Sequence, residues 1–375
     1  MPRLLAVHGY RSIRRLAVEL GPVTVVTGAN GAGKTNFYRA VRLLRAAARG
    51  DLPRRLAEDG GLDRVLWAGP RSGGAGTPVS LMLGLATEEG ERYLIDMGLP
   101  QPRDTMFGRD PEIKRELFFV GEAPRPSAML AERRGGRLVL HGPDGPAAAP
   151  RLLHPRESML TAAAGHPEAH ALDRLRRALA GWRFYDALRA DPAAPARGDG
   201  VAAWTPVLAD DGADLAPAVQ TIRESGGAAA LDRAIQEAFP GARLEILAEE
   251  GRLRLAFAQP GLLRPLGAEE LSDGTLRFLL LAAALLSPEP PELLVLDEPE
   301  TSLFRELLPA LAGLVLSASA RTRILLVSHE RALLDALLRD GADRVVHHEL
   351  VREDGASRSA GSGPLDGPRW QWGER

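Results

Sequence analysis

The last third of the chain shows the clearest pattern of hydrophobic and polar positions. Residues 293–296 and 324–327 are unbroken apolar runs, typical of strands that are covered on both faces in a parallel sheet. Apolar residues at helical spacing surround these runs at 275–286, 303–317 and 331–339. This alternation of strand and helix predicts an α/β fold with a parallel sheet and flanking helices.

Weaker patterns occupy the rest of the chain. They predict strands at 4–8, 16–20, 23–27, 79–86, 92–97, 117–122, 244–248 and 252–258, and helices at 35–49, 169–189, 215–224 and 228–239. Residues 143–155 are rich in Pro, Gly and Ala, which indicates a loop. The segment 351–375 is rich in Gly, Ser and Arg and predicts a flexible tail.

The composition is ordinary for a globular protein, with 45% hydrophobic and 26% charged residues. The net charge of −2 gives no global electrostatic reason for binding nucleic acid, so DNA contact would need a local basic patch. The absence of cysteine excludes disulfides, thiolate zinc sites and thiol catalysis. Because no segment is long and apolar enough to cross a bilayer, the sequence predicts a cytoplasmic protein without a membrane partner.

The strongest chemical signal is a match to the pattern G-x-x-x-x-G-K-[ST] between a predicted strand and a predicted helix. Such a loop binds phosphate oxygens through backbone N–H groups at a helix N-terminus. Lys34 would contact the β- and γ-phosphates of ATP, and the Thr35 hydroxyl would bind Mg²⁺. Only Lys34 and Lys114 are lysines among the 47 basic residues, so Lys34 occupies a position that calls for an ammonium group. The predicted loop comprises Gly28, Ala29, Asn30, Gly31, Ala32, Gly33, Lys34 and Thr35.

Two carboxylates, Asp297 and Glu298, directly follow the apolar run 293–296. In open α/β sheets, ligands bind at the carboxyl ends of the strands. Asp297 is therefore the predicted Mg²⁺ partner, through water, and Glu298 is the residue that would polarise the attacking water. A strand ending in an exposed acidic turn would show the same two residues, but the P-loop in the same chain favours catalysis.

Three further motifs resemble those of ABC-type ATPases. The segment 271–275 resembles the ABC signature and precedes an apolar helix, where Ser272, Asp273 and Gly274 would bind phosphate at the helix N-terminus. His329 stands at the end of the run 324–327, in the place of the switch histidine that contacts the γ-phosphate. Residues 299–304 occupy the position of the D-loop, which crosses the dimer interface in this class.

In their order, these motifs resemble the ATPase heads of SMC proteins, RecF and OLD-like AAA ATPases, and most of all stand-alone bacterial ATPases of the RecF-like and OLD-like kind. The resemblance implies a P-loop NTPase head of ABC/SMC type built from residues 1–105 and 255–350. Residues 106–254 would form an inserted α+β lobe. It also implies an ATP-dependent homodimer, in which Ser272 contacts the nucleotide of the partner subunit.

The chain departs from the class pattern at three places. Phe304 and Arg305 stand where the D-loop usually has His-Pro, and Asp273 replaces the first glycine of the signature. No glutamine is unambiguously the Q-loop residue, and Gln101 is the candidate for this metal contact.

Three functions remain open at this point. The first is an ATPase of DNA repair or genome defence, with arginine groups that could contact double-stranded DNA. The second is a slow ATP-dependent switch that controls a partner effector protein. The third is an ABC transporter subunit, which ranks last because the chain lacks an LSGGQ sequence and a clear Q-loop. The arginine groups are Arg11/Arg14/Arg15, Arg54/Arg55, Arg133/Arg134 and Arg174/Arg176/Arg177.

Overall fold

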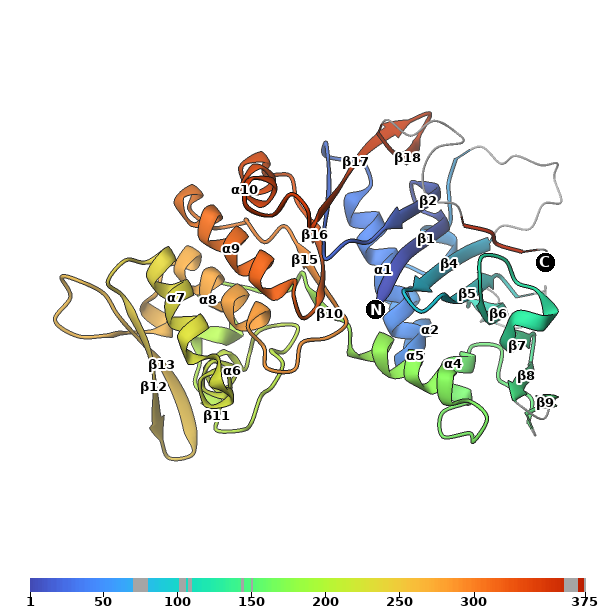
Figure 1. The fold of residues 1–375 in the computed structure, drawn as a ribbon, viewed down its shortest axis with the longest axis horizontal. Helices are drawn as coiled ribbons and strands as arrows, with labels where there is room; N and C mark the ends of the chain where they lie inside the picture. The colour runs from blue at the N-terminus through green and yellow to red at the C-terminus, as the bar shows by residue number, and fades with distance from the viewer. Residues whose placement is uncertain are drawn as a thin grey trace. The chain divides into compact units, whose positions relative to one another are not determined.

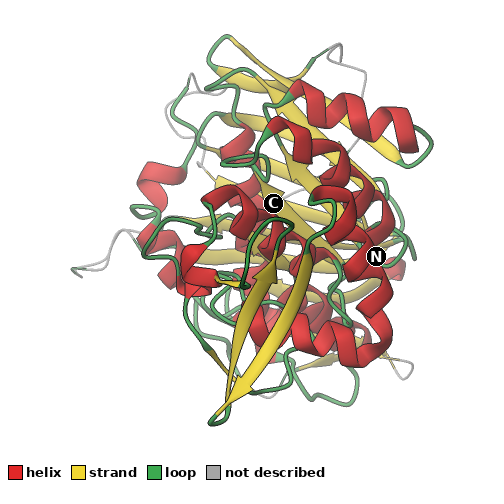
Figure 2. Cartoon of the chain, turned by 90° about the vertical axis from the view of Figure 1, so that its left-hand side faces the viewer, coloured by secondary structure: helices red, strands yellow, loops and turns green. Residues whose placement is uncertain are grey.

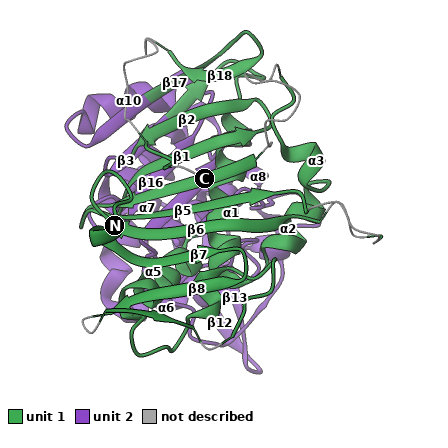
Figure 3. Cartoon of the chain, turned by 90° about the vertical axis from the view of Figure 1, so that its right-hand side faces the viewer, with its two compact units in different colours: residues 1–20, 26–182, 348–375 green, residues 21–25, 183–347 purple. Residues whose placement is uncertain are grey.

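The computed structural model describes residues 1–69, 80–100, 106, 110–142, 145–149, 151–360 and 370–373. The chain forms two compact units, coloured separately in Figure 3. Unit 1 comprises Met1–Leu20, Val26–Trp182 and His348–Arg375, and unit 2 comprises Gly21–Val25 and Arg183–His347. The boundary at Trp182 falls within residues 106–254, and the expected head and inserted lobe stay a prediction.

Unit 1 is built around an eight-stranded sheet with the strand order β2-β1-β4-β5-β6-β7-β8-β9. Each strand is antiparallel to its neighbours. The strands are β1 (Pro2–Tyr10), β2 (Ile13–Glu19), β4 (Ser80–Thr87), β5 (Glu91–Gly98), β6 (Glu112–Val120), β7 (Met129–Arg134), β8 (Arg137–Gly142) and β9 (Gly145–Ala148) (Figure 1). The helices are α1 (Lys34–Arg49), α2 (Leu52–Glu58), α3 (Leu62–Val65), η1 (Pro126–Ala128), α4 (Met159–Ala162) and α5 (His170–Gly181).

A group of buried side chains from unit 1 includes two tryptophans from the predicted flexible tail. Trp370 and Trp372 are 9% and 7% exposed and pack with apolar residues of the sheet such as Leu4 and Phe119. Gly84 allows this packing, because a Cβ at that position would overlap the Trp370 ring. The described parts of the segment 351–375 are therefore folded, since two large aromatic rings outweigh the polar composition around them.

The start of the same segment belongs to a strand pair, β17 (Val345–Glu353) and β18 (Ala356–Ser359). The turn between them uses Asp354 and Gly355, both in the left-handed region at φ of 49° and 79°. Such residues allow a two-residue hairpin turn. The Gly/Ser/Arg-rich composition concealed this hairpin in the sequence.

Unit 2 contains three parallel neighbours, β10 (Arg183–Tyr185), β15 (Leu293–Asp297) and β16 (Arg323–Val327). They belong to a six-stranded sheet with the order β10-β15-β16-β3-β17-β18, in which β3 is Val23–Gly28. The helices are α6 (Leu215–Ile222), η3 (Arg223–Gly227), α7 (Ala228–Ala238), α8 (Asp273–Leu285), α9 (Leu308–Ala318) and α10 (Arg331–Gly341), with short turns η2 (Pro195–Arg197), η4 (Ala268–Glu270) and η5 (Arg305–Leu307). Four strands form a further sheet: β11 (Gly200–Val201), β12 (Arg243–Glu249), β13 (Arg252–Ala258) and β14 (Leu266–Gly267).

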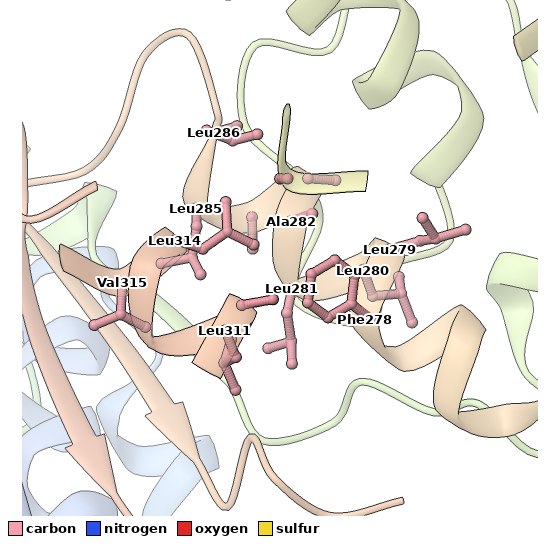
Figure 4. Close-up of a cluster of buried hydrophobic side chains, with 14 of the residues drawn as sticks. Phe278, Leu279, Leu280, Leu281, Ala282, Leu285, Leu286, Leu311, Leu314 and Val315 are labelled. Carbon is pink, nitrogen blue, oxygen red and sulfur yellow. The ribbon is translucent and has the colours of Figure 1, made fainter. Parts of the chain in front are cut away.

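The β12–β13 hairpin projects beyond the helices of unit 2, as Figures 1 and 2 show. The core lies instead between the helices and the parallel strands. Side chains of α8, including Phe278 and Leu281, pack against Leu311 and Val315 of α9 (Figure 4). Helix α8 is buried on nearly every side, which explains why its sequence is apolar all round.

The predicted α/β class is confirmed, and most predicted elements are present within a few residues. The prediction of one helix over 169–189 is wrong, because α5 ends at Gly181 and Trp182 leaves the helical region with a ψ of 143°. The following residues, Arg183–Tyr185, form β10 beside β15, and their aromatic side chains favour a strand. No helix in the described part of the chain is long and apolar enough to cross a membrane.

Candidate nucleotide-binding site

The P-loop of unit 1 connects β3 to α1 and depends on glycine at two points. Gly28 and Gly33 have φ angles of 146° and 105°, which L-residues rarely adopt. A Cβ at Gly28 would also collide with the carbonyl oxygen of Leu350, and one at Gly33 with the Ser357 hydroxyl. The loop is therefore held against the β17–β18 hairpin, a support that the sequence did not reveal.

Lys34 lies folded over the loop. It is 6% exposed, and its Nζ donates hydrogen bonds to the carbonyl oxygens of Gly28 at 2.7 Å and Ala29 at 3.3 Å. The first turn of α1 carries no acidic residue, so no carboxylate of the helix itself offsets the positive end of its dipole. Gly31 is exposed with open space around its Cα. The loop therefore fits the phosphate groups of a nucleotide.

A small polar network lies next to the loop. The hydroxyl oxygens of Ser12 and Ser357 are 2.7 Å apart, and the Asn36 side-chain amide donates to the Ser12 hydroxyl at 2.8 Å. The backbone N–H of Ser357 donates to the Ser12 carbonyl oxygen at 2.8 Å. These residues are far apart in sequence and match no motif, so only the fold identifies them.

The acidic edge of unit 2 assembles at the carboxyl ends of β15 and β16. Asp297 is paired with Val327 in the parallel register, and the Glu298 N–H donates to the Val327 carbonyl oxygen at 2.8 Å. This register places His329 beside the carboxylates, with its Nδ1 3.5 Å from Glu298 Oε1. Glu298 has a φ of 46°, a strained conformation that non-glycine residues adopt mainly where function requires it.

Glu300 also belongs to this site, although the sequence motifs assign it no role of its own. Its carboxylate is almost completely buried, and Oε1 accepts hydrogen bonds from the Ser328 hydroxyl at 2.7 Å and from the His329 N–H at 3.1 Å. The same oxygen lies 3.4 Å from His329 Nδ1. Two carboxylates next to Nδ1 fix the orientation of the ring.

Two further charged residues, Arg277 and Asp186, lie at this edge of the sheet. The Arg277 guanidinium donates to the carbonyl oxygens of Leu188 and Glu298, and its burial lowers its pKa although nearby acidic groups act in the opposite direction. Asp186 follows β10, whose Tyr185 is paired with Leu296 of β15, so Asp186 reaches the same sheet edge. Burial raises the pKa of Asp186 to about 6, and Asp210 adds to this rise.

The signature segment caps α8. The Ser272 hydroxyl accepts a hydrogen bond from the Thr275 N–H at 3.2 Å, and Ser272 and Asp273 are exposed. A Cβ at Gly274 would lie 2.8 Å from the Ser302 carbonyl oxygen and 3.4 Å from the Phe304 ring. The signature and the D-loop segment therefore form one surface of unit 2.

The predicted site residues are divided between the two units. Lys34 and the P-loop belong to unit 1, while Asp297, Glu298, His329 and the signature belong to unit 2. Gln101 lies outside the described residues. Among the described residues, no three His, Cys, Asp or Glu side chains are grouped so that they could hold a metal ion by themselves.

Most arginines of the candidate DNA-binding groups are paired with carboxylates. Arg133 is fully buried in an ion pair with Glu116 at 3.0 Å, so it is not available to a phosphate backbone. Ion pairs within unit 1 also involve Arg11, Arg54, Arg55, Arg134, Arg174, Arg176 and Arg177. Local carboxylates thus neutralise much of the positive charge that these groups would present to DNA.

Comparison with solved structures identifies the fold. The chain matches the head of an SMC protein bound to the C-terminal winged-helix domain of ScpA at 14% identity, with 96% of this chain and 97% of that chain covered and a TM-score of 0.52. It matches an SMC head with an extended coiled coil bound to the C-terminal domain of ScpA from Pyrococcus furiosus at 13% identity, with 96% of both chains covered and a TM-score of 0.51. Fold and motifs together define an ABC/SMC-class P-loop ATPase.

The particular family follows from the sequence profile that matches residues 23–335, described as "AAA domain, putative AbiEii toxin, Type IV TA system". The chain belongs to this family. No curated protein matches the chain in sequence. The predicted membership of the ABC/SMC class is thereby confirmed, while the likeness to RecF-like and OLD-like proteins stays a prediction.

Proposed function

We propose that this protein binds and hydrolyses ATP with Mg²⁺ as an ATP-sandwiched homodimer that acts in DNA repair or genome defence. The observation that carries the hydrolytic part is the pairing of Glu298 with His329 at 3.5 Å, beside Asp297 at the end of two parallel strands. This pair offers a carboxylate to an attacking water and an imidazole to a terminal phosphate.

Each residue has a defined role in this proposal. The N–H groups from Gly28 to Thr35 and the Lys34 ammonium group bind the phosphates, and Lys34 exchanges its contacts with loop carbonyls for phosphate oxygens. Thr35, Asp297 (through water) and Gln101 would hold Mg²⁺, which would neutralise charge on the phosphates.

Two observations support the dimer. Ser272 and Asp273 are exposed at the N-terminus of α8, where N–H groups attract an anion from outside the chain. The signature contacts the D-loop segment at Gly274, and Phe304 is 62% exposed beside it. A second copy of the chain would cover this surface and bring its own nucleotide to Ser272.

The biological role rests on the comparisons rather than on the site. The family description names a toxin of a toxin–antitoxin system, which agrees with a role in defence. A second candidate function is an ATP-dependent switch that controls a partner protein, favoured because two matched SMC heads are bound to ScpA domains. The ion pairs of the arginine groups also favour a protein partner over DNA.

Glu298→Gln tests the hydrolytic dimer. The amide cannot polarise water, so turnover should fall by roughly 100-fold or more, while ATP binding persists. Size-exclusion chromatography with light scattering should then show a dimer with ATP and a monomer without nucleotide. Glu306→Gln, an exposed glutamate of η5, serves as the matched control. A Glu298→Gln protein that stays monomeric at saturating ATP rejects the sandwich.

The two roles are separated by measuring ATP turnover with and without double-stranded DNA at a fixed salt concentration, because phosphate contacts are salt-dependent. Stimulation by DNA would support the repair role. Slow turnover that DNA leaves unchanged would support the switch.

A further inference from the structure

Arg197 holds the segment that leads into the signature. Its guanidinium donates to the carbonyl oxygens of Ala268 at 3.0 Å, Glu269 at 3.3 Å and Leu271 at 2.8 Å. The Arg197 side chain is only 9% exposed. These three acceptors lie in η4 and the residue directly after it, just before the Ser272 cap of α8.

The opposite edge of the same guanidinium is also fixed. Nη2 donates to the Ala190 carbonyl oxygen at 2.6 Å and Nε to the Asp191 carbonyl oxygen at 3.0 Å. Arginine supplies up to five N–H donors in one rigid plane, so a single side chain can join two backbone segments. Arg197 therefore fastens the residues before Ser272 to the segment that begins after Tyr185 and follows β10.

Arg197 also pairs with the residue that departs from the signature pattern. Its Nη2 lies 2.7 Å from Asp273 Oδ1, while the Asp273 side chain is 51% exposed. A carboxylate in the first turn of α8 occupies the place that attracts phosphate and repels an approaching triphosphate. The neighbouring guanidinium reduces this repulsion and draws the carboxylate towards the protein.

We propose that Arg197 is a positioning residue for the signature, which orients the Leu271–Ser272 backbone and neutralises Asp273 so that the α8 N-terminus can accept the nucleotide of a partner subunit. This inference rests on the proposed ATP-sandwiched dimer. The inference explains why Asp273 is tolerated where the class usually has glycine, because the Arg197 guanidinium neutralises its carboxylate. None of the contacts involves the P-loop, so binding of ATP by the chain's own P-loop should not depend on Arg197.

The test compares dimer formation in the Glu298→Gln background. Arg197→Ala should raise the dissociation constant of the ATP-bound dimer at least about 10-fold, since several charged hydrogen bonds are lost. Binding of a fluorescent ATP analogue by the monomer should change less than about 2-fold, because the contacts of Arg197 lie around the signature. Arg223→Ala is the matched control, because Arg223 also joins a carboxylate, Asp232, to a backbone carbonyl, that of Leu244, within unit 2.

A second pair of variants covers the case in which Arg197→Ala does not fold. Arg197→Lys keeps a cation that cannot reach all the acceptors, and should weaken the dimer by an intermediate factor. Adding Asp273→Asn should restore part of that loss, because a lysine neutralises the Asp273 carboxylate less completely and asparagine carries no charge. A merely structural arginine would show no such recovery.

The outcomes are distinct. If the Glu298→Gln parent itself stays monomeric with ATP, the proposed function fails. If the parent dimerises and Arg197→Lys dimerises equally well, or Arg197→Ala acts no differently from Arg223→Ala, the inference about Arg197 is overturned. Weaker dimerisation of Arg197→Lys with partial recovery by Asp273→Asn supports it.

Discussion

The P-loop of unit 1 and the acidic edge of unit 2 are assembled in different ways. The P-loop is one continuous segment, and glycine conformations with a single lysine determine its shape. The acidic edge collects Asp186, Asp297, Glu300 and His329 from the ends of three parallel strands. The P-loop should tolerate little change in its own sequence. The geometry of the acidic edge depends instead on contacts between residues of different strands.

The two regions also differ in charge. The P-loop presents one buried ammonium group and the positive end of a helix, with no acidic residue in its first turn. The edge gathers several carboxylates, and the largely buried guanidinium of Arg277 lies next to them. Substitutions should therefore act on binding in unit 1, and on turnover and stability in unit 2.

Lys34→Ala should have the largest effect. Loss of the only ammonium group in the P-loop removes charge-assisted bonds to the phosphates, and we expect ATP affinity to fall by about 100-fold or more. Isothermal titration calorimetry measures this directly. Lys114→Ala is the matched control, since Lys114 is the other lysine and forms a half-buried ion pair with Glu112 outside the P-loop. Unchanged affinity in Lys34→Ala would contradict the assignment of the P-loop.

Glu300→Ala should have the next largest effect and should act on turnover. Without the buried carboxylate, Ser328 and the His329 N–H lose their acceptor, and we expect turnover to fall by roughly 10- to 100-fold. ATP affinity should change less than about 3-fold, because Glu300 touches His329 rather than the P-loop. Steady-state kinetics with a binding titration separates the two quantities.

Glu300→Gln sharpens this result. The amide oxygen can still accept from Ser328, so part of the activity should return. If Glu300→Ala weakened ATP binding as much as turnover, the carboxylate would not act through the orientation of His329.

Asp186→Asn should have a smaller effect, on stability and with a pH dependence. The folded-state pKa of about 6 lies above the ordinary value of 3.8, so the folded state binds more protons between these values and stability falls as pH rises through them. Asparagine removes the cost of burying an ionised carboxylate. It should therefore stabilise the fold by about 1–3 kcal/mol near neutral pH, with no gain below pH 4. Chemical denaturation at both pH values measures the difference.

Asp191→Asn provides the contrast for this prediction. The Asp191 side chain is 43% exposed, and its hydrogen bonds with Arg189 lower its pKa to about 2. Its substitution should give no stabilisation near neutral pH. Equal stabilisation by both variants would show that burial of Asp186 is not the cause.

Much of the fold and half of the candidate site follow from local sequence. The P-loop, the carboxylates after residues 293–296 and the Ser-His after 324–327 are recognisable because each lies within one short segment. Apolar runs predict buried parallel strands, and strand ends predict where a ligand binds. The sequence therefore determined the ATPase class and the residues at each strand end.

Only the tertiary structure decided what supports these residues. The long-range contacts of Ser357 with Gly33, of Glu300 with His329 and of Arg197 with Asp273 connect positions that no spacing rule relates. The short strand β10 was concealed in a predicted helix, because three residues carry too weak a periodicity to outweigh a neighbouring helical pattern. Trp370 and Trp372 likewise pack in a core cluster of unit 1, although they lie in a segment whose composition indicated a flexible tail. Local segments encode the chemistry of the site, whereas packing between distant segments fixes its geometry, because burial and hydrogen bonding depend on the folded chain.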